Sequence, residues 1–200
     1  MQSQLTLFYM NRENQQVNIS SQQEEGNPNT FYFYTANATT GYNVGIEFEH
    51  SFKIIDDFTM FYNFGYLNTN VDSYAFKTNE TTTVILGDRE QAQAPNYTYS
   101  YGLNYKNPFG IRSSCKVSGK DEFYFSDSHD MKSEKYQLLD VTLGYDYESF
   151  SIMIWSKNIL DKRYTIRGFY FGLEPPNYED KLYVQWGDPV QYGMTLKYQF

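Results

Sequence analysis

The sequence predicts an all-β protein, an antiparallel transmembrane β-barrel segment of about nine strands joined by connections of unequal length. Three observations support this fold class. Several stretches alternate between apolar and polar residues, aromatic residues make up 20% of the chain, with 21 Tyr and 16 Phe, and short connections alternate with long polar ones. A period of two places every second side chain on one face of a strand, and a tilted strand of about 9 to 11 residues crosses a bilayer.

The alternating stretches follow one another along the whole chain. His50 interrupts the apolar set of one stretch, and Phe61 blurs another. Aromatic and β-branched residues on a single face are typical of barrel walls, which also concentrate aromatics at both membrane interfaces. In chain order the stretches are residues 1–9, 42–52, 58–66, 96–107, 139–147 and 190–200.

The connections between strands differ in length in a regular order. Bacterial barrels place short turns at the periplasmic end and long loops at the extracellular end. Short connections fall at residues 11–14, 54–57, 107–110 and 147–150, and long ones at residues 21–39, 72–95, 126–134 and 159–189. This order predicts a count of about nine strands, or of roughly eight or ten if the first strand is misread.

The polar faces of these strands carry charges of both signs. A soluble sandwich would bury the apolar faces against a second sheet, whereas an outer-membrane barrel turns them to lipid and keeps the polar faces inside. Alternation alone does not separate these two folds, but the unequal connections favour the barrel. The charges expected in its interior are Glu47, Glu49, Arg112, Lys116, Lys120, Asp140, Asp146 and Lys197.

Composition argues against other classes of protein. No apolar run reaches the length of about 18 residues that a transmembrane helix needs. The mean hydropathy of −0.64 suits a barrel, in which only every second residue meets lipid. A net charge of −8 without a basic stripe argues against a nucleic-acid partner. The single cysteine, Cys115, provides no intrachain disulfide and is interpreted as a small wall residue.

Motifs in the second half of the chain resemble those of TonB-dependent outer-membrane receptors of the siderophore type. That family shows Asn-Leu-x-Asp-x-x-Tyr and then Gly-x-Pro-Arg before its last strand, and Val190 stands here where the family usually has Arg. Segments of the first half that are similar to family segments extend the resemblance over residues 30–200. The matching residues are Asn37-Ala38, Gly45-Ile46-Glu47-Phe48-Glu49, Ala94-Pro95, Asn158-Ile159-Leu160-Asp161 with Tyr164, Gly187-Asp188-Pro189 and the terminal Phe200.

The resemblance implies a barrel of about 22 strands, of which residues 1–200 would be the C-terminal portion, with the plug domain absent. It implies a receptor of the cell outer membrane that takes up a scarce ligand, most often a ferric siderophore. The expected partners are outer-membrane lipid, lipopolysaccharide, the siderophore, and the TonB system acting through the missing plug. We expect no cofactor and no enzymatic activity. The first strand starts without an export signal, and the segment alone is not expected to transport.

The long stretch 159–189 contains the candidate ligand contacts. Arg and rigid aromatic side chains supply much of the energy of recognition, although packing within the loop or anchoring at the interface is the alternative interpretation. By the resemblance, the terminal Phe200 would act in barrel assembly. The candidate ligand contacts are Arg163, Arg167, Tyr170, Tyr178 and Trp186.

A second loop contains residues that suggest chemistry. Ser128, His129 and Asp130 are adjacent in sequence, but a catalytic relay needs side chains that converge from separate elements, so no relay is expected. Asp127, His129 and Asp130 could hold a metal ion, and a solvated loop is the alternative.

Three classes of function fit these observations to different degrees. Part of a TonB-dependent receptor accounts for the motifs, the connections and the aromatic strands, and is our prediction. A small outer-membrane barrel that acts as a passive pore or adhesin would need an even number of strands and an export signal. A soluble carbohydrate-binding sandwich would need connections of similar length at both ends.

Overall fold

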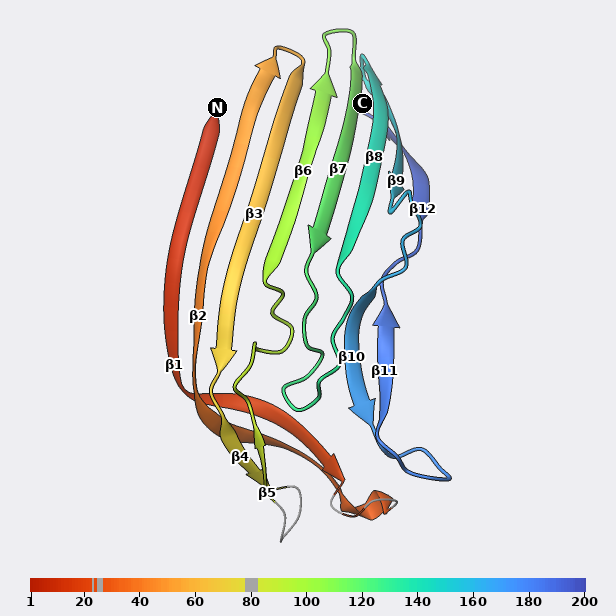
Figure 1. Cartoon of the computed structure of the whole chain (residues 1–200). Helices are drawn as coiled ribbons and strands as arrows, with labels where there is room; N and C mark the ends of the chain where they lie inside the picture. Colours follow the sequence, from red (N-terminus) through yellow and green to blue (C-terminus); the bar gives the residue numbers. More distant parts are fainter. Residues whose placement is uncertain (23, 25–26, 78–82) are drawn as a thin grey trace.

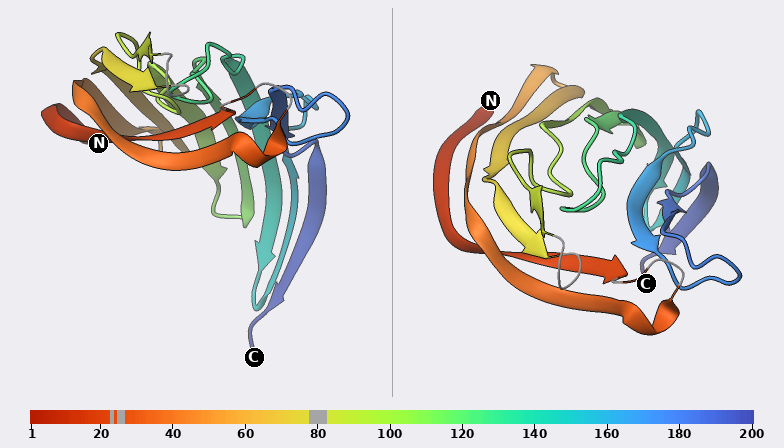
Figure 2. Two further views of the ribbon diagram at one scale, coloured as in Figure 1. Left: turned by 90° about the horizontal axis from the view of Figure 1, so that it is seen from below. Right: turned by 60° about the horizontal axis from the view of Figure 1, so that its bottom comes forward.

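The computed structural model describes residues 1–22, 24, 27–77 and 83–200 and shows one open, curved antiparallel sheet (Figure 1; Figure 2). Two hairpins and a 3-10 helix, η1 (Pro28–Thr30), lie outside this sheet. Within the described residues, no helix is long and apolar enough to cross a membrane. In spatial order the sheet contains β1 (Gln2–Gln22), β2 (Phe31–Ile55), β3 (Phe58–Val71), β6 (Tyr97–Lys106), β7 (Ile111–Lys120), β8 (Tyr136–Tyr147), β9 (Phe150–Lys157) and β12 (Gln191–Tyr198). The hairpins are β4 (Tyr74–Lys77) with β5 (Thr83–Leu86), and β10 (Thr165–Phe171) with β11 (Lys181–Trp186).

The strand register places the apolar sets of neighbouring strands on one face of the sheet. Phe48 of β2 pairs with Phe64 of β3, and Leu143 of β8 pairs with Ile154 of β9, which pairs in turn with Met194 of β12. Leu143, Ile154 and Met194 are 58%, 56% and 60% exposed. An exposed apolar face of this extent is the surface that a barrel turns to lipid. The predicted all-β antiparallel fold is confirmed.

The connections confirm the predicted alternation of lengths. Short turns join β2 to β3, β6 to β7 and β8 to β9 at one end of the sheet, where both chain termini also lie (Figure 1). We call this the short-turn end. At the opposite, long-connection end lie the loop 121–135 and the hairpins β4–β5 and β10–β11. In the β6–β7 turn, Gly110 has a φ of +90° and lies against the backbone of Asp146, where a side chain would not fit.

Two expectations about the first 40 residues are wrong. Residues 11–14 form a bulge within one continuous strand, in which Asn14 has a φ of 54°, so the sheet has eight strands. The stretch 21–39 is mostly the distal part of a long β1–β2 ribbon, and residues 23, 25 and 26 of it lie outside the described residues. A bulge adds residues without ending the pairing, which explains why a turn-like sequence occurs in mid-strand.

A small hydrophobic cluster holds the ribbon where it bends across the long-connection end (Figure 1). Val17 of β1 and Val71 of β3 are 1% and 3% exposed, and they pack with Tyr74, Val84 and Leu86 of the β4–β5 hairpin. Complete burial of a Val side chain contributes about 1.5–3 kcal/mol. The bend of β1, the end of β3 and the β4–β5 hairpin therefore form one packed unit.

The sheet is not closed within this chain. In the described structure β1 is paired with β2 alone and β12 with β9 alone, so both are edge strands. Unpaired backbone groups of an edge strand are strongly unfavourable in hydrocarbon, where water cannot bond to them. Phe200 lies beyond β12, with its ring 5.2 Å from that of Tyr198 in an edge-to-face arrangement.

Candidate functional site

The polar face of the sheet carries the charges that were expected in a barrel interior. Arg112 Nη2 lies 3.1 Å from Asp146 Oδ1, and Lys116 Nζ lies 3.7 Å from Asp140 Oδ2. Strand alternation puts both pairs on the face opposite the exposed aliphatic residues. Two of the charges on β7 are thus neutralised by carboxylates of the neighbouring strand, whereas Lys120 Nζ lies 4.1 Å from the ring centre of Phe123.

The part of the polar face that β2 forms is acidic. Glu47 and Glu49 lie two residues apart on β2, and no cation of the described residues lies within ion-pair distance of either carboxylate. They line a pocket of about 360 Å³ together with Asn63, Thr98 and Ser100. This part of the polar face has charge without a partner.

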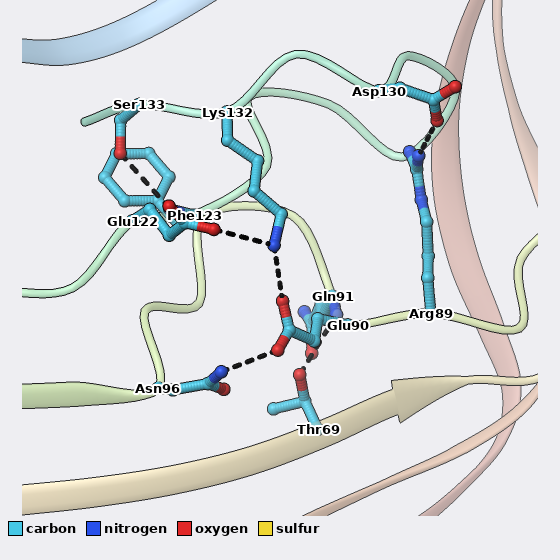
Figure 3. Close-up of polar contacts among 10 residues, drawn as sticks. All are labelled: Thr69, Arg89, Glu90, Gln91, Asn96, Glu122, Phe123, Asp130, Lys132 and Ser133. Atoms are coloured by element: carbon cyan, nitrogen blue, oxygen red, sulfur yellow. Dashed lines mark hydrogen bonds and ion pairs between the residues drawn. The ribbon is translucent and has the colours of Figure 1, made fainter. Parts of the chain in front are cut away.

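Two connections lie against this face at the long-connection end and are joined to each other (Figure 3). We call residues 87–96, residues 121–135 and the β10–β11 hairpin the outer platform. Gln91 fixes the first connection to the sheet, because its N–H donates to Thr69 Oγ1 at 3.0 Å and its side-chain oxygen accepts from Arg12 at 3.0 Å. The connection therefore has a fixed position above the polar face.

Glu90 and Lys132 form the polar centre of the platform (Figure 3). Glu90 accepts a hydrogen bond from Asn96 Nδ2 at 2.6 Å, and Lys132 Nζ lies 3.2 Å from Glu90 Oε2 and 3.2 Å from Glu122 Oε1. The bond from Asn96, assisted by Lys132, lowers the pKa of Glu90 although burial opposes this. The charged carboxylate therefore ties the two connections together.

Aromatic and cationic groups add a second link between the same connections. Arg89 Cζ and Lys132 Nζ lie 4.4 Å and 4.3 Å from the ring centre of Tyr124. Arg89 also donates to Asp130 Oδ1 at 2.7 Å and to the carbonyl oxygen of Ser126 at 2.8 Å. Cation–π contacts contribute about 0.5–2 kcal/mol, depending on desolvation. The face of the Arg89 guanidinium thus contacts Tyr124, and its N–H groups bind Asp130 and Ser126 of the same loop.

His129 joins the loop 121–135 to the β10–β11 hairpin. Its ring stacks on Tyr170 with the centroids 3.6 Å apart, and its Nε2 lies 3.6 Å from Asp180 Oδ2. Burial lowers the pKa of His129, and Asp180 opposes this shift. Gly168 faces Phe125 so closely that a Cβ would overlap the ring. The three parts of the platform are therefore in contact with one another.

The loop that contains the candidate metal ligands Asp127, His129 and Asp130 directs these side chains to different partners. Asp130 pairs with Arg89, Asp127 Oδ1 accepts from the N–H of Ala92 at 3.3 Å, and Ser128 Oγ lies 3.1 Å from His129 Nδ1. Burial raises the pKa of Asp127. Among the described residues, no three His, Cys, Asp or Glu side chains are grouped in a way that could hold a metal ion.

The candidate ligand contacts do not converge on one point. Arg167 and Tyr170 are three residues apart on β10 and point to opposite faces of the hairpin, because side chains alternate along a strand. Tyr170 packs on the loop 121–135, whereas Arg167 is exposed. Arg163 precedes β10, Tyr178 lies in the loop between the hairpin strands, and the 59% exposed Trp186 ends β11. A ligand contact at these residues stays a prediction.

Sequence reasoning missed the polar centre of the platform. Glu90 pairs with Lys132, and Arg89 pairs with Asp130, across two connections that are about 40 residues apart in the chain, with separations of 42 and 41 residues. Charged residues in two polar connections carry no signal of such pairing. Only the assignment of both connections to the same end of the sheet pointed towards it.

Comparison with known proteins places the chain in a family. A sequence model of the TonB dependent receptor-like β-barrel matches residues 2–168. The chain belongs to this family. The resemblance inferred from the sequence motifs is thereby confirmed, and the family is one of outer-membrane transport receptors, not of enzymes.

Solved structures of uptake receptors and of a transporter share the fold at low sequence identity. The ferric yersiniabactin uptake receptor FyuA from Yersinia pestis has 18% identity and a TM-score of 0.74 over 99% of this chain and 27% of its own. The siderophore receptor PiuA from Acinetobacter baumannii has 14% identity and a TM-score of 0.67, with 97% and 26% covered. The copper transporter OprC has 12% identity and a TM-score of 0.71, with 99% and 29% covered. The chain therefore spans little more than a quarter of these receptors.

In this TonB-dependent receptor-like barrel, residues 158–190 leave the sheet between β9 and β12, and we call them the long excursion. The Asn158-Ile159-Leu160-Asp161 motif joins the two ends of this excursion. Asn158, which is 3% exposed, donates through Nδ2 to the carbonyl oxygens of Lys162 at 3.0 Å and Asp188 at 3.1 Å. Its Oδ1 accepts from the N–H of Lys162 at 2.9 Å, and Asp161 Oδ1 accepts from the N–H of Val190 at 3.0 Å. We call this arrangement the clasp. It brings the start and the end of the excursion together, and so positions the β10–β11 hairpin.

Proposed function

We propose that this chain forms part of an outer-membrane receptor for the TonB-dependent uptake of a scarce ligand, with a ferric siderophore as the cargo. The observation that carries the proposal is the sheet itself, which has an exposed apolar face, a charged opposite face and all long connections at one end. A wall between lipid and a polar passage needs these two faces. The names of similar structures, such as a ferric yersiniabactin uptake receptor, support the class of cargo.

We infer that the long-connection end faces the outside of the cell, where the outer platform is the first part to meet a ligand. Loops fixed on a rigid scaffold are suited to recognition. Arg163, Arg167, Tyr170, Tyr178 and Trp186 are the ligand contacts that we propose on the β10–β11 hairpin and its flanks. In this orientation the apolar face contacts outer-membrane lipid, and the platform lies at the level of lipopolysaccharide.

We further propose that residues 1–200 are the C-terminal portion of the receptor barrel and that a plug domain outside this chain connects it to TonB. The edge strands β1 and β12 would pair with the remaining strands of the barrel, which satisfies their backbone groups. No cation of the described residues pairs with Glu47 or Glu49, so both carboxylates are suited to basic side chains of a plug. Phe200 would act in barrel assembly.

Uptake of labelled iron by cells tests this proposal. Cells with and without the gene for the whole receptor that contains this chain receive ⁵⁵Fe as its citrate, catecholate and hydroxamate chelates, each with and without a protonophore. We expect one chelate to accumulate only in cells that contain the protein, and only without the protonophore. Uptake that is insensitive to the protonophore would support a passive pore, and equal uptake in both strains for every chelate would contradict the proposal.

A further inference from the structure

A row of polar side chains crosses the exposed apolar face of the sheet. The register pairs one residue of β1 with one of β2, that residue with one of β3, and the last with one of β6, and these strands lie side by side (Figure 1). In the β8, β9 and β12 part of the same face, by contrast, the cross-strand row is aliphatic throughout. We call the four residues the polar row: Ser3, His50, Tyr62 and Tyr101.

The polar row lies halfway along the part of the strands that spans the membrane. On β3 the apolar set of this face runs from Phe58 to Tyr66, and Tyr62 is its central residue. Tyr101 has the same central place on β6. About 9 to 11 tilted strand residues cross the hydrocarbon, and barrels gather their tyrosines at the two interfaces. These two tyrosines are therefore at the depth where lipid tails surround a barrel.

Within the described residues, the polar row has a single hydrogen bond. Ser3 Oγ lies 2.7 Å from His50 Nδ1, and the imidazole lies between the rings of Phe48 and Phe52, with centroids 5.9 and 5.1 Å away. His50 Nε2 and the hydroxyls of Tyr62 and Tyr101 have no hydrogen-bond partner in the described part of the chain. Hydrocarbon cannot supply a partner, and polar groups inside a membrane generally pair with other protein groups.

The surface around the polar row is built from ordered aromatic rings. Tyr97, Tyr99 and Tyr101 are stacked along β6 with centroids 6.3 and 6.2 Å apart. The hydroxyl of Tyr99 donates to Gln137 Oε1 at 2.9 Å, which fixes the middle ring. Tyrosine is enriched where proteins contact one another, because a rigid ring gives a large contact area and its hydroxyl gives a hydrogen bond. This part of the wall thus has the composition of a protein contact surface.

We propose that the outer face of β2, β3 and β6 is the contact surface between two copies of the receptor in the membrane. The outer side of a closed barrel is reached neither by a plug nor by the remaining strands, so only a second molecule can bond to the polar row. Copies in one membrane have the same orientation, and a two-fold axis along the membrane normal brings their polar rows to the same depth.

The polar row is complementary to itself. A hydroxyl both donates and accepts, so the hydroxyls of Tyr62 and Tyr101 in one copy can bond to His50 Nε2 and to the hydroxyls of the other copy. Hydrogen bonds of this kind hold polar segments together within membranes. The inference goes beyond the transport proposal, because the contact requires a barrel wall but neither cargo nor TonB.

Cross-linking in outer membranes tests the proposal in the whole receptor that contains this chain. Met60→Cys places a thiol beside Tyr62 on this face and leaves the polar row intact, and Cys115→Ala removes the native thiol of this chain. Leu143→Cys in the same background is the control, because Leu143 lies on the aliphatic part of the face. Two differently tagged copies are expressed together and treated with a short bismaleimide.

We expect a product that contains both tags, formed about fivefold or more faster from Met60→Cys than from Leu143→Cys. Equal cross-linking at the two positions, including none at either, would overturn the proposal, as would a product that never contains both tags. A Met60→Cys receptor that cross-links but takes up no iron would contradict the transport proposal alone. One that takes up iron without cross-linking would contradict this inference alone.

Matched variants in the Met60→Cys background test the role of the polar row. His50→Phe and Tyr62→Phe keep an aromatic ring and remove the polar group, and Tyr145→Phe removes a hydroxyl from the same face on β8. Heat-modifiable migration on gels verifies that each variant is folded. The two row variants should lower cross-linking by about fivefold, and Tyr145→Phe should leave it unchanged. Equal effects of all three would overturn the role of the polar row.

Discussion

Replacement of Asn158 tests whether the clasp holds the long excursion between β9 and β12. Its side chain makes three hydrogen bonds, at 3.0, 3.1 and 2.9 Å, and is 3% exposed. Asn158 also has a φ of 48°, a left-handed conformation that glycine adopts without strain and alanine does not. Asn158→Gly therefore removes the hydrogen bonds and keeps the backbone, whereas Asn158→Ala perturbs both.

The hydrogen bonds determine the expected magnitude. Each contributes about 0.5–1.5 kcal/mol net, and carbonyl or N–H groups left buried without a partner add to the loss. We therefore expect Asn158→Gly to lower the local free energy of opening by about 2–4 kcal/mol, and Asn158→Ala to lower it by about 1 kcal/mol more. At about 1.4 kcal/mol per tenfold, the glycine variant corresponds to roughly 30-fold to 700-fold faster opening-limited exchange.

Amide hydrogen exchange read by mass spectrometry measures this effect. Peptides from residues 158–164 and 187–191 should lose protection in both variants, while peptides from β6 and β7 should be unchanged. Asn177→Gly is the matched control, since Asn177 is an exposed asparagine of the same excursion. If Asn158→Gly exchanged as slowly as the control at residues 187–191, the proposed role of the clasp would be refuted.

Three further changes test other contacts of the site. Lys132→Met should loosen the loop 121–135 by about 1 kcal/mol and raise its protease cleavage about fivefold, whereas Lys135→Met, at an exposed position, should not. Burial lowers the pKa of His129, so the folded platform binds fewer protons than the open one. The neutral His129 therefore stabilises the folded platform above about pH 6.5, and this contribution is lost as the pH falls through the lowered pKa. Amide hydrogen exchange in the loop 121–135 should accordingly become faster on acidification, and His129→Gln should remove this pH dependence. The same pH dependence in the wild-type protein and in His129→Gln would contradict this role of His129. Gly187→Ala should destabilise the excursion by about 1–3 kcal/mol, because the added Cβ overlaps the Tyr164 ring, and Tyr164→Leu should restore part of this in a double-mutant cycle.

The strands could be predicted because one physical cause acts on every second residue. Lipid on one side and a polar interior on the other impose a period of two, which is clear in residues 96–107, 139–147 and 190–200. The β6–β7 turn was recognisable for a similar reason, since Gly110, with a φ of +90°, has a conformation that few other residues adopt. Both signals are local in sequence.

The bulge in β1 and the pairings of the platform could not be predicted. Residues 11–14 contain turn-like polar residues, and only pairing with β2 shows that the strand continues through them. The contact between Glu90 and Lys132 depends on how two connections fold over the sheet, and no periodicity records it. The sequence placed Arg167 and Tyr170 in one candidate site, but the strand formed by this segment turns them to opposite faces.

Lipid exposure of neighbouring residues on β8 tests the central claim most directly, namely that one face of the sheet meets lipid and the other lines a polar passage. Leu143→Cys and Thr142→Cys, each made with Cys115→Ala so that the introduced cysteine is the only one, are labelled with bimane in outer membranes. We expect brominated lipid to quench the label at position 143, and a water-soluble quencher to act at position 142. Equal quenching of both labels by either agent would contradict the two-faced wall on which the proposed function rests.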